Sequence, residues 1–449
     1  MARLFGTDGV RGVAGTELDA VLAYDLGRAG AYLLSLGNKR PRILVGRDTR
    51  ISGQMLEAAL SSGICSVGAD VLSVGIMPTP AVAWLTRKYG CDAGVVISAS
   101  HNPMEYNGIK FFDGNGLKLP DAVEDRIEEL IREKVDELPK ASGADMGTIQ
   151  HVERAEDDYI DFLKSLMDVS VKGVQVVLDC ANGAAHHIAP RLFRELGAKV
   201  LSLYDEPDGC NINDGCGSTH TEHIQRIVRD TGADIGFAFD GDADRMLAVD
   251  GDGDLIDGDR IMAICALDMK ERGLLSGNTL VMTVMSNLGL RVAMENAGIG
   301  VSVTGVGDRY VLERMLEQGY SIGGEQSGHV IFLSDNTTGD GLVSAVRLLS
   351  AVKRSGKPLC QCKRVMDIYP QVLKNVTLAS NEGKELFKAD AAIADLIKEI
   401  EESYAGRGRV LVRASGTEPL IRVMVEGADE HKVKRDAHAL AELIRQRLG

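Results

Sequence analysis

The feature of this sequence that most limits how the chain can fold is a plan of strands and helices that recurs three times. Each copy begins with a short apolar segment typical of a buried strand, continues through a helix-like stretch, and adds two further strand-like segments. A glycine that can end a helix precedes the second strand of each copy. Strands that alternate with helices favour parallel or mixed sheets covered on both faces. The predicted strands lie at 42–46, 68–73, 93–98, 174–179, 197–202, 233–239, 279–284, 298–303 and 320–323.

The plan changes near residue 370. A strand at 372–378, a helix at 387–404, two strands around residues 413–417 and a last helix at 430–448 are typical of a small α+β unit. Polar stretches at 140–157 and 250–257 mark two further boundaries. The sequence therefore predicts three similar α/β domains with mixed sheets, at 1–155, 156–255 and 256–369. A C-terminal α+β domain at 370–449, with helices flanking an antiparallel sheet, follows them.

Polar and unusual segments follow the third predicted strand of every copy. In sheets of this kind ligands bind beyond the carboxyl ends of the strands, so we expect the chemistry there. The three segments are Ser100-His-Asn-Pro103, Asp240-Gly-Asp-Ala-Asp-Arg245 and Gly324-Glu-Gln-Ser-Gly-His329.

The second segment has the composition of a metal site. Asp240, Asp242 and Asp244 lie two residues apart, so in extended backbone their carboxylates leave on one side and need a cation to lie together. Their hard oxygen atoms suit Mg²⁺, Mn²⁺ or Ca²⁺ rather than Zn²⁺. An EF-hand is excluded, because Arg245 and Gly251 stand at its sixth and twelfth positions. A solvated acidic turn is the alternative, and the place after a buried strand favours the metal.

Ser100 follows the apolar strand at 93–98 and should lie exposed at the sheet edge. Its hydroxyl is a candidate nucleophile, or alternatively an ordinary helix cap. The pattern G-x-S-x-G of α/β-hydrolases is absent. Adjacency alone does not make His101 the base for this hydroxyl.

A phosphate site is predicted in the C-terminal unit. Two guanidiniums, two hydroxyls and a glycine turn suit a phosphate dianion, although a polar hairpin with surface arginines is the alternative. No Walker A motif and no G-x-G-x-x-G occurs, so nucleotide use has no support. The residues concerned are Arg413, Ser415, Gly416, Thr417 and Arg422. In the third repeat Glu325, Ser327 and His329 could bind vicinal hydroxyls, or could simply form a turn.

The charge balance narrows the choice of partner. Asp and Glu number 65 against 50 Lys and Arg, which gives a formal charge of −15. Such a chain repels polyanions, so we expect a small phosphorylated ligand and neither nucleic acid nor a membrane. The eight cysteines form no C-x-x-C pair and no long apolar run occurs. These features predict a cytoplasmic protein with reduced thiols.

Taken together, the motifs resemble those of the α-D-phosphohexomutase superfamily, in order and over essentially the whole chain. Three segments are more similar to the branch that acts on glucosamine phosphates than to the one that acts on mannose and glucose phosphates: Phe5-Gly-Thr-Asp8, Gly324-Glu-Gln326 and Asn336-Thr-Thr-Gly-Asp-Gly341. The motifs of the superfamily are Phe5-Gly-Thr-Asp-Gly-Val-Arg-Gly12, Ser98-Ala-Ser-His-Asn-Pro103, Asp240-Gly-Asp-Ala-Asp-Arg245, Gly324-Glu-Gln-Ser-Gly-His329 and Arg413-Ala-Ser-Gly-Thr-Glu-Pro419.

The resemblance implies a fold of three similar α/β domains and a helix-flanked fourth, and a reaction. That reaction interconverts glucosamine 6-phosphate and glucosamine 1-phosphate through a phosphoserine enzyme and a 1,6-bisphosphate, and supplies UDP-N-acetylglucosamine for the cell wall. The resemblance also implies a homodimer.

The resemblance also assigns roles to individual residues. It makes Ser100 the activating phosphoserine, and one Mg²⁺ per active site would be bound by Ser100, Asp240, Asp242 and Asp244. The catalytic group is completed by Arg11, His101, Lys110 and Arg245, with Lys110 as general acid/base. The sugar-binding residues are Glu325, Ser327 and His329, and the phosphate-binding residues are Arg413, Ser415, Gly416, Thr417 and Arg422.

Three alternatives stay open at this point. A sister mutase would act on glucose or mannose phosphates. A Mg²⁺-dependent phosphatase of the haloacid-dehalogenase type would use Asp240 as nucleophile and release free phosphate. A non-catalytic sugar-phosphate sensor would have little need for Ser100, Lys110 and a metal site together.

Overall fold

The chain divides into two compact units. The computed structural model describes residues 3–6, 8–34, 38, 40–134, 137–378, 382–414 and 419–448. The first unit comprises Met1–Met285 and Ile299–Val365, and the second comprises Ser286–Gly298 and Met366–Gly449. No helix in the described ranges is both long and apolar enough to cross a membrane.

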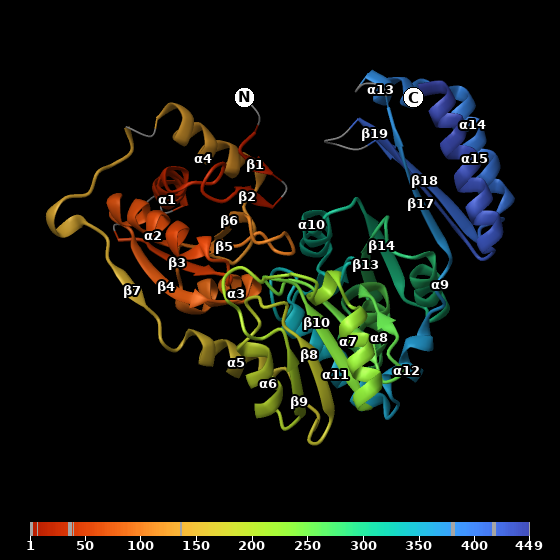
Figure 1. The fold of residues 1–449 in the computed structure, drawn as a ribbon, viewed down its shortest axis with the longest axis horizontal. Helices are drawn as coiled ribbons and strands as arrows, with labels where there is room; N and C mark the ends of the chain where they lie inside the picture. Colours follow the sequence, from red (N-terminus) through yellow and green to blue (C-terminus); the bar gives the residue numbers. More distant parts are fainter. Residues whose placement is uncertain are drawn as a thin grey trace. The chain divides into compact units, whose positions relative to one another are not determined.

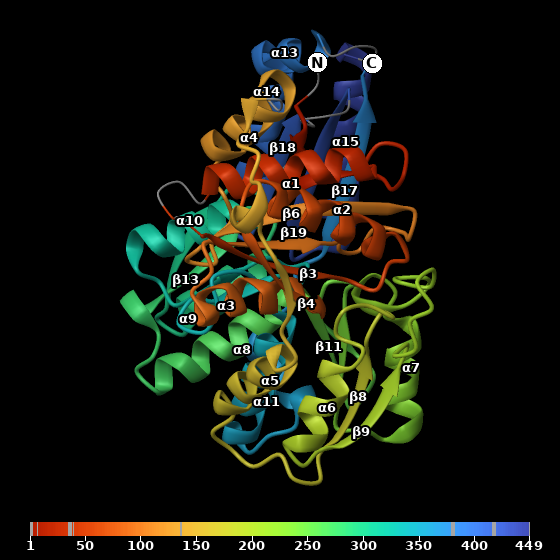
Figure 2. The same cartoon turned by 90° about the vertical axis from the view of Figure 1, so that its left-hand side faces the viewer.

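The first repeat forms a mixed sheet around β3 (Arg42–Arg47), which runs parallel to β4 (Asp70–Ile76) and β5 (Ala93–Ile97). Every residue of β5 is buried, as expected for a strand covered on both faces. Helices α1 and α2 cover one face and α3 the other (Figures 1 and 2). The helices are α1 (Ala20–Leu34), α2 (Ser52–Ser66), α3 (Thr79–Tyr89) and α4 (Asp121–Glu133). The strand order is β1-β2-β6-β5-β3-β4-β7, with β1 (Phe5–Gly6), β2 (Gly9–Val13), β6 (Tyr106–Asp113) and β7 (Ile149–His151).

The second repeat has the same central arrangement. Strand β8 (Gln175–Asp179) runs parallel to β9 (Lys199–Leu203) and β10 (Ile235–Phe239). Next to β10 lies β11 (Met246–Asp250), and β12 (Leu255–Ile256) forms the edge beyond it. The helices are α5 (Ala155–Ser165), α6 (Ile188–Glu195) and α7 (Glu222–Thr231).

In the third repeat β13 (Thr279–Thr283) runs parallel to β14 (Gly300–Thr304) and β15 (Ile322–Gly324). The order is β14-β13-β15-β16, with β16 (Val330–Phe332) at the edge. The helices of this part are α8 (Gly258–Glu271), α10 (Asp308–Gln318), α11 (Gly341–Ser355) and α12 (Leu359–Cys362).

Each repeat also contains a strand that the sequence analysis did not predict. The third strand is followed in every copy by an antiparallel partner: β6 after β5, β11 after β10 and β16 after β15. The sheets are therefore mixed, as predicted. Each polar segment singled out above is the loop of such a hairpin.

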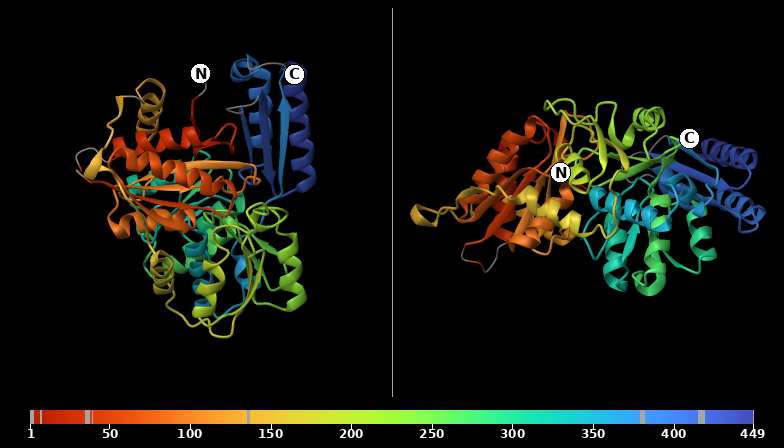
Figure 3. Two further views of the ribbon diagram at one scale, coloured as in Figure 1. Left: turned by 60° about the vertical axis from the view of Figure 1, so that its left-hand side comes forward. Right: turned by 90° about the horizontal axis from the view of Figure 1, so that it is seen from below.

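The second unit is built on a small antiparallel sheet with the order β17-β19-β18. Helices α14 and α15 lie against one face of this sheet, where they bury a separate apolar core (Figure 3). The helix predicted at 387–404 is two helices, because the carboxylate of Asp390 accepts a hydrogen bond from the Ile393 N–H and starts a new helix there. The elements are β17 (Gln371–Thr377), α13 (Glu382–Ala389), α14 (Ala391–Ser403), β18 (Gly408–Ala414), β19 (Leu420–Gly427) and α15 (Glu430–Leu448).

A short segment of the third repeat belongs to this second unit. It carries α9 (Leu288–Asn296), and the N–H of Leu288 donates to Glu426 on β19 over 2.9 Å. The side chain of Asn287 donates to the carbonyl of Tyr369 over 3.0 Å. The domain boundaries drawn from the sequence stay a prediction.

Candidate active site

Ser100 lies directly beyond the carboxyl end of β5, on the β5–β6 loop. Its backbone has a φ of 54°, in the left-handed region that residues other than glycine seldom adopt. The exposure expected from the sequence is wrong, because the loop of the aspartates covers the side chain, and the buried hydroxyl donates to Oδ2 of Asp240 over 2.7 Å. The next element after Ser100 is strand β6, so the alternative of a helix cap is wrong. The structure thus joins the first two predicted polar segments through this hydroxyl.

Asp240, Asp242 and Asp244 lie together on the β10–β11 loop. Their backbone is a turn with Ala243 at a φ of 55°, so the extended conformation assumed from the sequence is wrong. The turn nevertheless brings one carboxylate oxygen of each residue within 4.8 Å of the others, and all three side chains are buried. The predicted cluster of carboxylates therefore forms, by curling of the loop rather than by alternation along a strand.

These carboxylates are unequal in their surroundings. Burial, with Asp244 and Asp242 nearby, raises the pKa of Asp240 well above its usual value. Burial also opposes the charge of Asp244, but His329, Lys110 and Arg245 outweigh it and hold its pKa far below the usual range. One oxygen of Asp242 and one of Asp244 are buried without a hydrogen-bond partner in the described part of the chain. Buried carboxylate oxygens left in this way are expected where a cation binds.

The donor set fits a hard divalent cation. Three carboxylates and a hydroxyl converge, and among the described residues no cysteine or histidine belongs to the group of ligand atoms. A cation here would also satisfy the two oxygens that lack partners and would offset the repulsion among three buried negative charges.

Lys110 on β6 approaches the same cluster from the other side. Its Nζ lies 2.9 Å from Oδ2 of Asp242 and 2.8 Å from Oδ2 of Asp8. Burial lowers the pKa of Lys110, but these two carboxylates outweigh it and raise the pKa above its ordinary value. In this arrangement Lys110 carries its proton and can act as an acid.

Asp8, which contacts Lys110, also forms ion pairs with two other basic side chains. Its carboxylate also accepts from Arg11 over 2.5 Å and from Lys118 over 2.7 Å. Lys118 in turn contacts Asp308 at the start of α10 over 2.5 Å. The first and third repeats are therefore linked by alternating charges.

His101 and Arg245 flank the serine. Nδ1 of His101 lies 3.3 Å from the Ser100 hydroxyl, and a guanidinium nitrogen of Arg245 lies 3.1 Å from the same Nδ1. Burial, followed by the charges of Arg245 and Arg11, lowers the pKa of His101. A neutral imidazole is therefore expected beside the hydroxyl, with Nδ1 as the acceptor.

The third segment contributes groups of different accessibility. Ser327 is exposed and Glu325 is half-buried, with its carboxylate accepting from the Gly307 N–H over 3.1 Å. His329 is buried, and its Nδ1 lies 3.5 Å from Oδ2 of Asp244. Its Nε2 lies 3.6 Å from Oδ2 of Asp308. His329 therefore links the β10–β11 loop, which carries the three aspartates, to the third repeat.

The predicted phosphate site lies in the second unit. Arg413 on β18 pairs directly with Arg422 on β19. Like charges at opposed positions of an antiparallel pair repel each other, so a bound anion would stabilise this arrangement. The remaining predicted residues, Ser415, Gly416 and Thr417, lie outside the described residues.

Comparison with known proteins finds one family that matches almost the whole chain. Models of the phosphoglucomutase/phosphomannomutase family match it in four consecutive stretches. The alpha/beta/alpha domains I, II and III match residues 2–137, 157–253 and 257–369, and the C-terminal domain matches residues 373–443.

A phosphoglucosamine mutase of Thermoanaerobacter sp. (strain X514) is 58% identical over 449 residues, covering 100% of both chains. This chain belongs to the phosphoglucosamine mutase family. A second phosphoglucosamine mutase, of Ruminiclostridium cellulolyticum, is 57% identical over 450 residues, again covering 100% of both. A solved structure of a phosphoglucomutase/phosphomannomutase family protein from Burkholderia thailandensis has a TM-score of 0.84 at 26% identity, covering 99% of this chain and 98% of that one.

Membership of the phosphoglucosamine mutase family makes the chain an isomerase that moves a phosphoryl group, as its motifs predicted. The fold expected from the resemblance is confirmed as well. The phosphatase and the sensor considered above find no support in this family.

Several polar residues at the site were missed by reasoning from the sequence. Thr79, at the start of α3, donates to Oδ2 of Asp242 over 2.7 Å. Asp48 and Arg50 follow β3 and lie buried beneath the Ser100 loop, while Asp308 begins α10. The rule that ligands bind beyond the carboxyl ends of strands would have found Asp48 and Arg50, had it been applied to the first strand of the repeat as well as the third.

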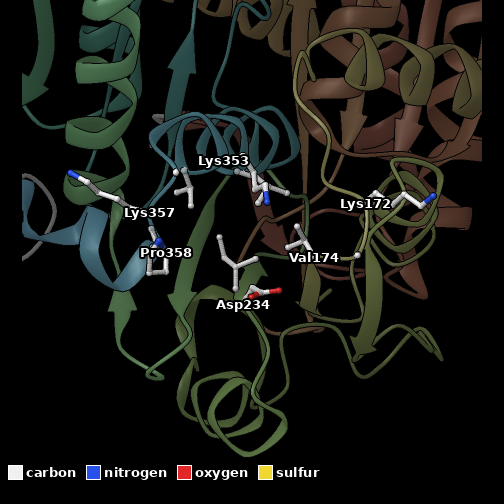
Figure 4. A pocket seen from close by; sticks show the side chains of 12 residues that line it. Lys172, Val174, Asp234, Lys353, Lys357 and Pro358 are labelled. Carbon is white, nitrogen blue, oxygen red and sulfur yellow. The ribbon is translucent and has the colours of Figure 1, made fainter.

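A hollow in the surface lies away from these residues. Its volume is about 400 Å³, and it is lined by the start of β10 and the turn between α11 and α12. Asp240 stands at the other end of β10. The ammonium groups of Lys172 and Lys357 point away from Asp234 at its floor (Figure 4). This hollow contains none of the predicted site residues.

Proposed function

We propose that this chain interconverts glucosamine 6-phosphate and glucosamine 1-phosphate, with Ser100 as the carrier of the phosphoryl group. The observation that carries the proposal is the buried Ser100 hydroxyl, 2.7 Å from Asp240 within a cluster of three carboxylates. The high identity to phosphoglucosamine mutases over the full chain supports the choice of sugar.

The reaction proceeds in two transfers. Phosphoserine 100 gives its phosphoryl group to the C1 hydroxyl of glucosamine 6-phosphate: the bond from phosphorus to Oγ breaks, a bond to O1 forms, and the hydroxyl loses its proton. The resulting 1,6-bisphosphate turns over in the site. The hydroxyl of Ser100 then takes the phosphoryl group from O6, which leaves glucosamine 1-phosphate.

The carboxylates of Asp240, Asp242 and Asp244, together with Ser100, would hold one Mg²⁺. When bound, this ion would polarise the phosphoryl group and stabilise the departing serine oxygen. Phosphoserine brings about −1.5 to −2 charges of its own next to three carboxylates, which makes a cation necessary.

The surrounding side chains divide the remaining tasks. Lys110 carries a proton within the site and serves as general acid/base for the oxygen atoms that gain or lose the phosphoryl group. Arg245 and Arg11 stabilise negative charge on the phosphoryl oxygens. His101, neutral at 3.3 Å from the serine hydroxyl, accepts a hydrogen bond from Arg245 and so helps to position that guanidinium beside Ser100.

Substrate binding is assigned to the loop of the third repeat and to the C-terminal unit. Glu325, Ser327 and His329 bind the sugar, and Glu325 offers a carboxylate to an ammonium group. Arg413 and Arg422, with Ser415, Gly416 and Thr417, bind the phosphate that is not reacting.

The protein's surroundings are a further part of the proposal. A homodimer is proposed from the resemblance, and light scattering of the purified protein tests it. All eight cysteines are free in the structure, which supports a cytoplasmic location with reduced thiols. The charge of −15 supports the absence of nucleic acid and membrane partners.

The deciding experiment measures mutase turnover and covalent phosphate in the same preparations. We expect intact-mass and peptide analysis to find phosphate on Ser100, and Ser100→Ala to lose turnover entirely. Ser165→Ala is the control, because this hydroxyl bonds only within α5. Near-normal turnover in Ser100→Ala would refute the assignment. Comparing kcat/KM for the 6-phosphates of glucosamine, glucose and mannose tests the choice of sugar.

A further inference from the structure

Arg50 is a fully buried arginine for which neither the fold nor the proposed reaction has yet accounted. It follows β3 directly, and its side chain and that of its partner Asp48 are both completely inaccessible to solvent. Burying an ion pair is expensive and seldom adds net stability compared with apolar residues of the same size. A pair kept at such a position is therefore worth testing for a role beyond stability.

Nearly all the donors of Arg50 are directed at one loop. Its guanidinium donates to the carbonyl oxygens of Ser100 over 2.9 Å, Asn102 over 2.8 Å and Pro103 over 2.5 Å. The remaining nitrogen, Nε, donates to Oδ2 of Asp48 over 2.9 Å. One side chain thus fixes three carbonyls of the loop that carries the reactive serine.

Asp48 extends this contact to the other side of the serine backbone. Its Oδ2 accepts from the hydroxyl of Ser98 over 2.6 Å, and that hydroxyl accepts from the N–H of Ser100 over 3.0 Å. Both the N–H and the carbonyl of Ser100 are therefore tied, directly or through one side chain, to the Asp48–Arg50 pair. Ser100 has a φ of 54°, which costs a residue with a side chain on the order of 1 kcal/mol and has to be imposed by its surroundings.

The second repeat adds one more contact to the same carbonyls. The side-chain amide of Asn213 donates to Ser100 over 2.9 Å and to Asn102 over 3.1 Å. Asn213 itself has a φ of 59°. The carbonyl of Ser100 thus lies between donors from two repeats, close to the loop that carries the aspartates.

We infer that the Asp48–Arg50 pair is a positioning device, which holds Ser100 in its left-handed conformation so that the hydroxyl points at the carboxylate cluster. The inference rests on the proposed function, because it concerns the serine that carries the phosphoryl group. Arg50 is buried beneath the loop, and its guanidinium donates to the loop carbonyls and to Asp48. Only a planar guanidinium supplies donors in enough directions for three carbonyls and a carboxylate, so lysine cannot replace it.

The test is Arg50→Lys, which keeps the charge and loses the fork of donors. Since a misplacement of about 1 Å can lower a rate about 100-fold, kcat should fall by that order. The KM for glucosamine 6-phosphate should stay within about twofold, because the sugar-binding residues are untouched. Single-turnover loss of phosphate from Ser100, followed by intact mass after rapid quenching, should slow by the same factor as kcat.

Arg347→Lys is the matched control. Arg347 forms a partly buried, two-bond pair with Asp335, with both contacts at 2.7 Å, on a helix outside the site. The substitution Arg347→Lys should lower the melting temperature and leave kcat unchanged. If Arg50→Lys fails to fold, Asn213→Gly removes an amide from the same carbonyls without leaving a buried charge, and we expect a smaller loss in kcat at constant KM.

The outcomes separate the two proposals. A kcat for Arg50→Lys, or for Asn213→Gly where the first does not fold, that matches the control would overturn the positioning role. So would a loss expressed only in KM. An absence of phosphate from Ser100 in the active wild-type enzyme would instead refute the proposed function, and with it the need to position a carrier.

Discussion

Substituting Gly241 by alanine tests how closely the serine loop and the aspartate loop must approach. A Cβ atom placed on Gly241 would lie 2.6 Å from the carbonyl oxygen of Ser100, 2.8 Å from Nδ2 of Asn213 and 2.9 Å from Cδ1 of Ile212. Cβ atoms essentially never come within 3.0 Å of another atom, so the loops must separate by at least about 0.4 Å. The nearest of the three is a backbone carbonyl oxygen, which cannot move aside as the end of a flexible side chain could.

The expected cost follows from the sensitivity of catalysis to position. If a displacement of 1 Å lowers the rate about 100-fold, a separation of 0.4 Å to 1 Å predicts a fall in kcat of about 6-fold to 100-fold. KM should change little, because the sugar-binding residues lie on other loops.

Gly251→Ala is the matched control, measured by steady-state turnover and melting temperature. The nearest atom to a Cβ at Gly251 is 3.4 Å away, an ordinary contact, and neither glycine needs a left-handed backbone. The control should keep kcat within about twofold of the wild type. A folded Gly241→Ala protein with the same kcat as this control would show that the close approach of the two loops is not needed for transfer.

Three further predictions concern the metal, the phosphate site and pH. Removing divalent metal with EDTA should abolish turnover and leave the melting transition cooperative, with recovery on adding Mg²⁺; undiminished rates in excess chelator would exclude the carboxylate site as a metal centre. Arg413→Ala combined with Arg422→Ala should raise the KM for the sugar phosphate at least tenfold, since each charge-assisted hydrogen bond contributes about 1.5–3 kcal/mol, and an unchanged KM would make both arginines ordinary surface residues. Burial raises the pKa of Asp179 from 3.8 to about 6, so the folded state favours its protonated form, and the stability this supplies is complete below pH 4 and lost as pH rises through 6. Relative to the wild type, the free energy of unfolding of Asp179→Asn should therefore rise between pH 4.5 and pH 7, by about 3 kcal/mol at most. A melting-temperature difference that is independent of pH in this range would contradict the shift.

The strands and polar loops of the first unit could be predicted because they depend on local pattern. Apolar runs ending in polar segments identified the loops of Ser100 and of Asp240, and the rule for sheet edges placed both at carboxyl ends of strands. The fourth strand of each repeat escaped notice, although in the first repeat the run from Asn107 to Phe112 contains Ile109, Phe111 and Phe112, and β-branched and aromatic residues are typical of a strand.

The contacts that the supporting residues make could not be predicted from such patterns. An arginine such as Arg50 is normally solvated, and only the folded chain brings carbonyls some fifty positions away onto its guanidinium. Asp308 reads as an acidic residue in the first turn of a helix, a common and stabilising choice with no link to a site. The left-handed φ of Ser100 could not be predicted locally either, because the residue at this position is a serine and not a glycine. These features arise from contacts between residues far apart in the sequence, which a local pattern does not contain.

The repeated hairpin explains how three copies of one unit can supply different chemistry to a single place. In each copy the third strand pairs antiparallel with the strand after it, and the last paired residues are Ile97 with Ile109, Phe239 with Met246, and Gly324 with Val330. Each loop therefore leaves and re-enters its sheet at one edge, and its sequence is free to change while the ladder fixes its ends. The loops meet directly, with the hydroxyl of the first on a carboxylate of the second, and another carboxylate of the second beside an imidazole of the third. Because each contact joins two copies, a change in one loop alters the geometry of its neighbour. The effects on kcat of substitutions in two of these loops should therefore be non-additive when the substitutions are combined.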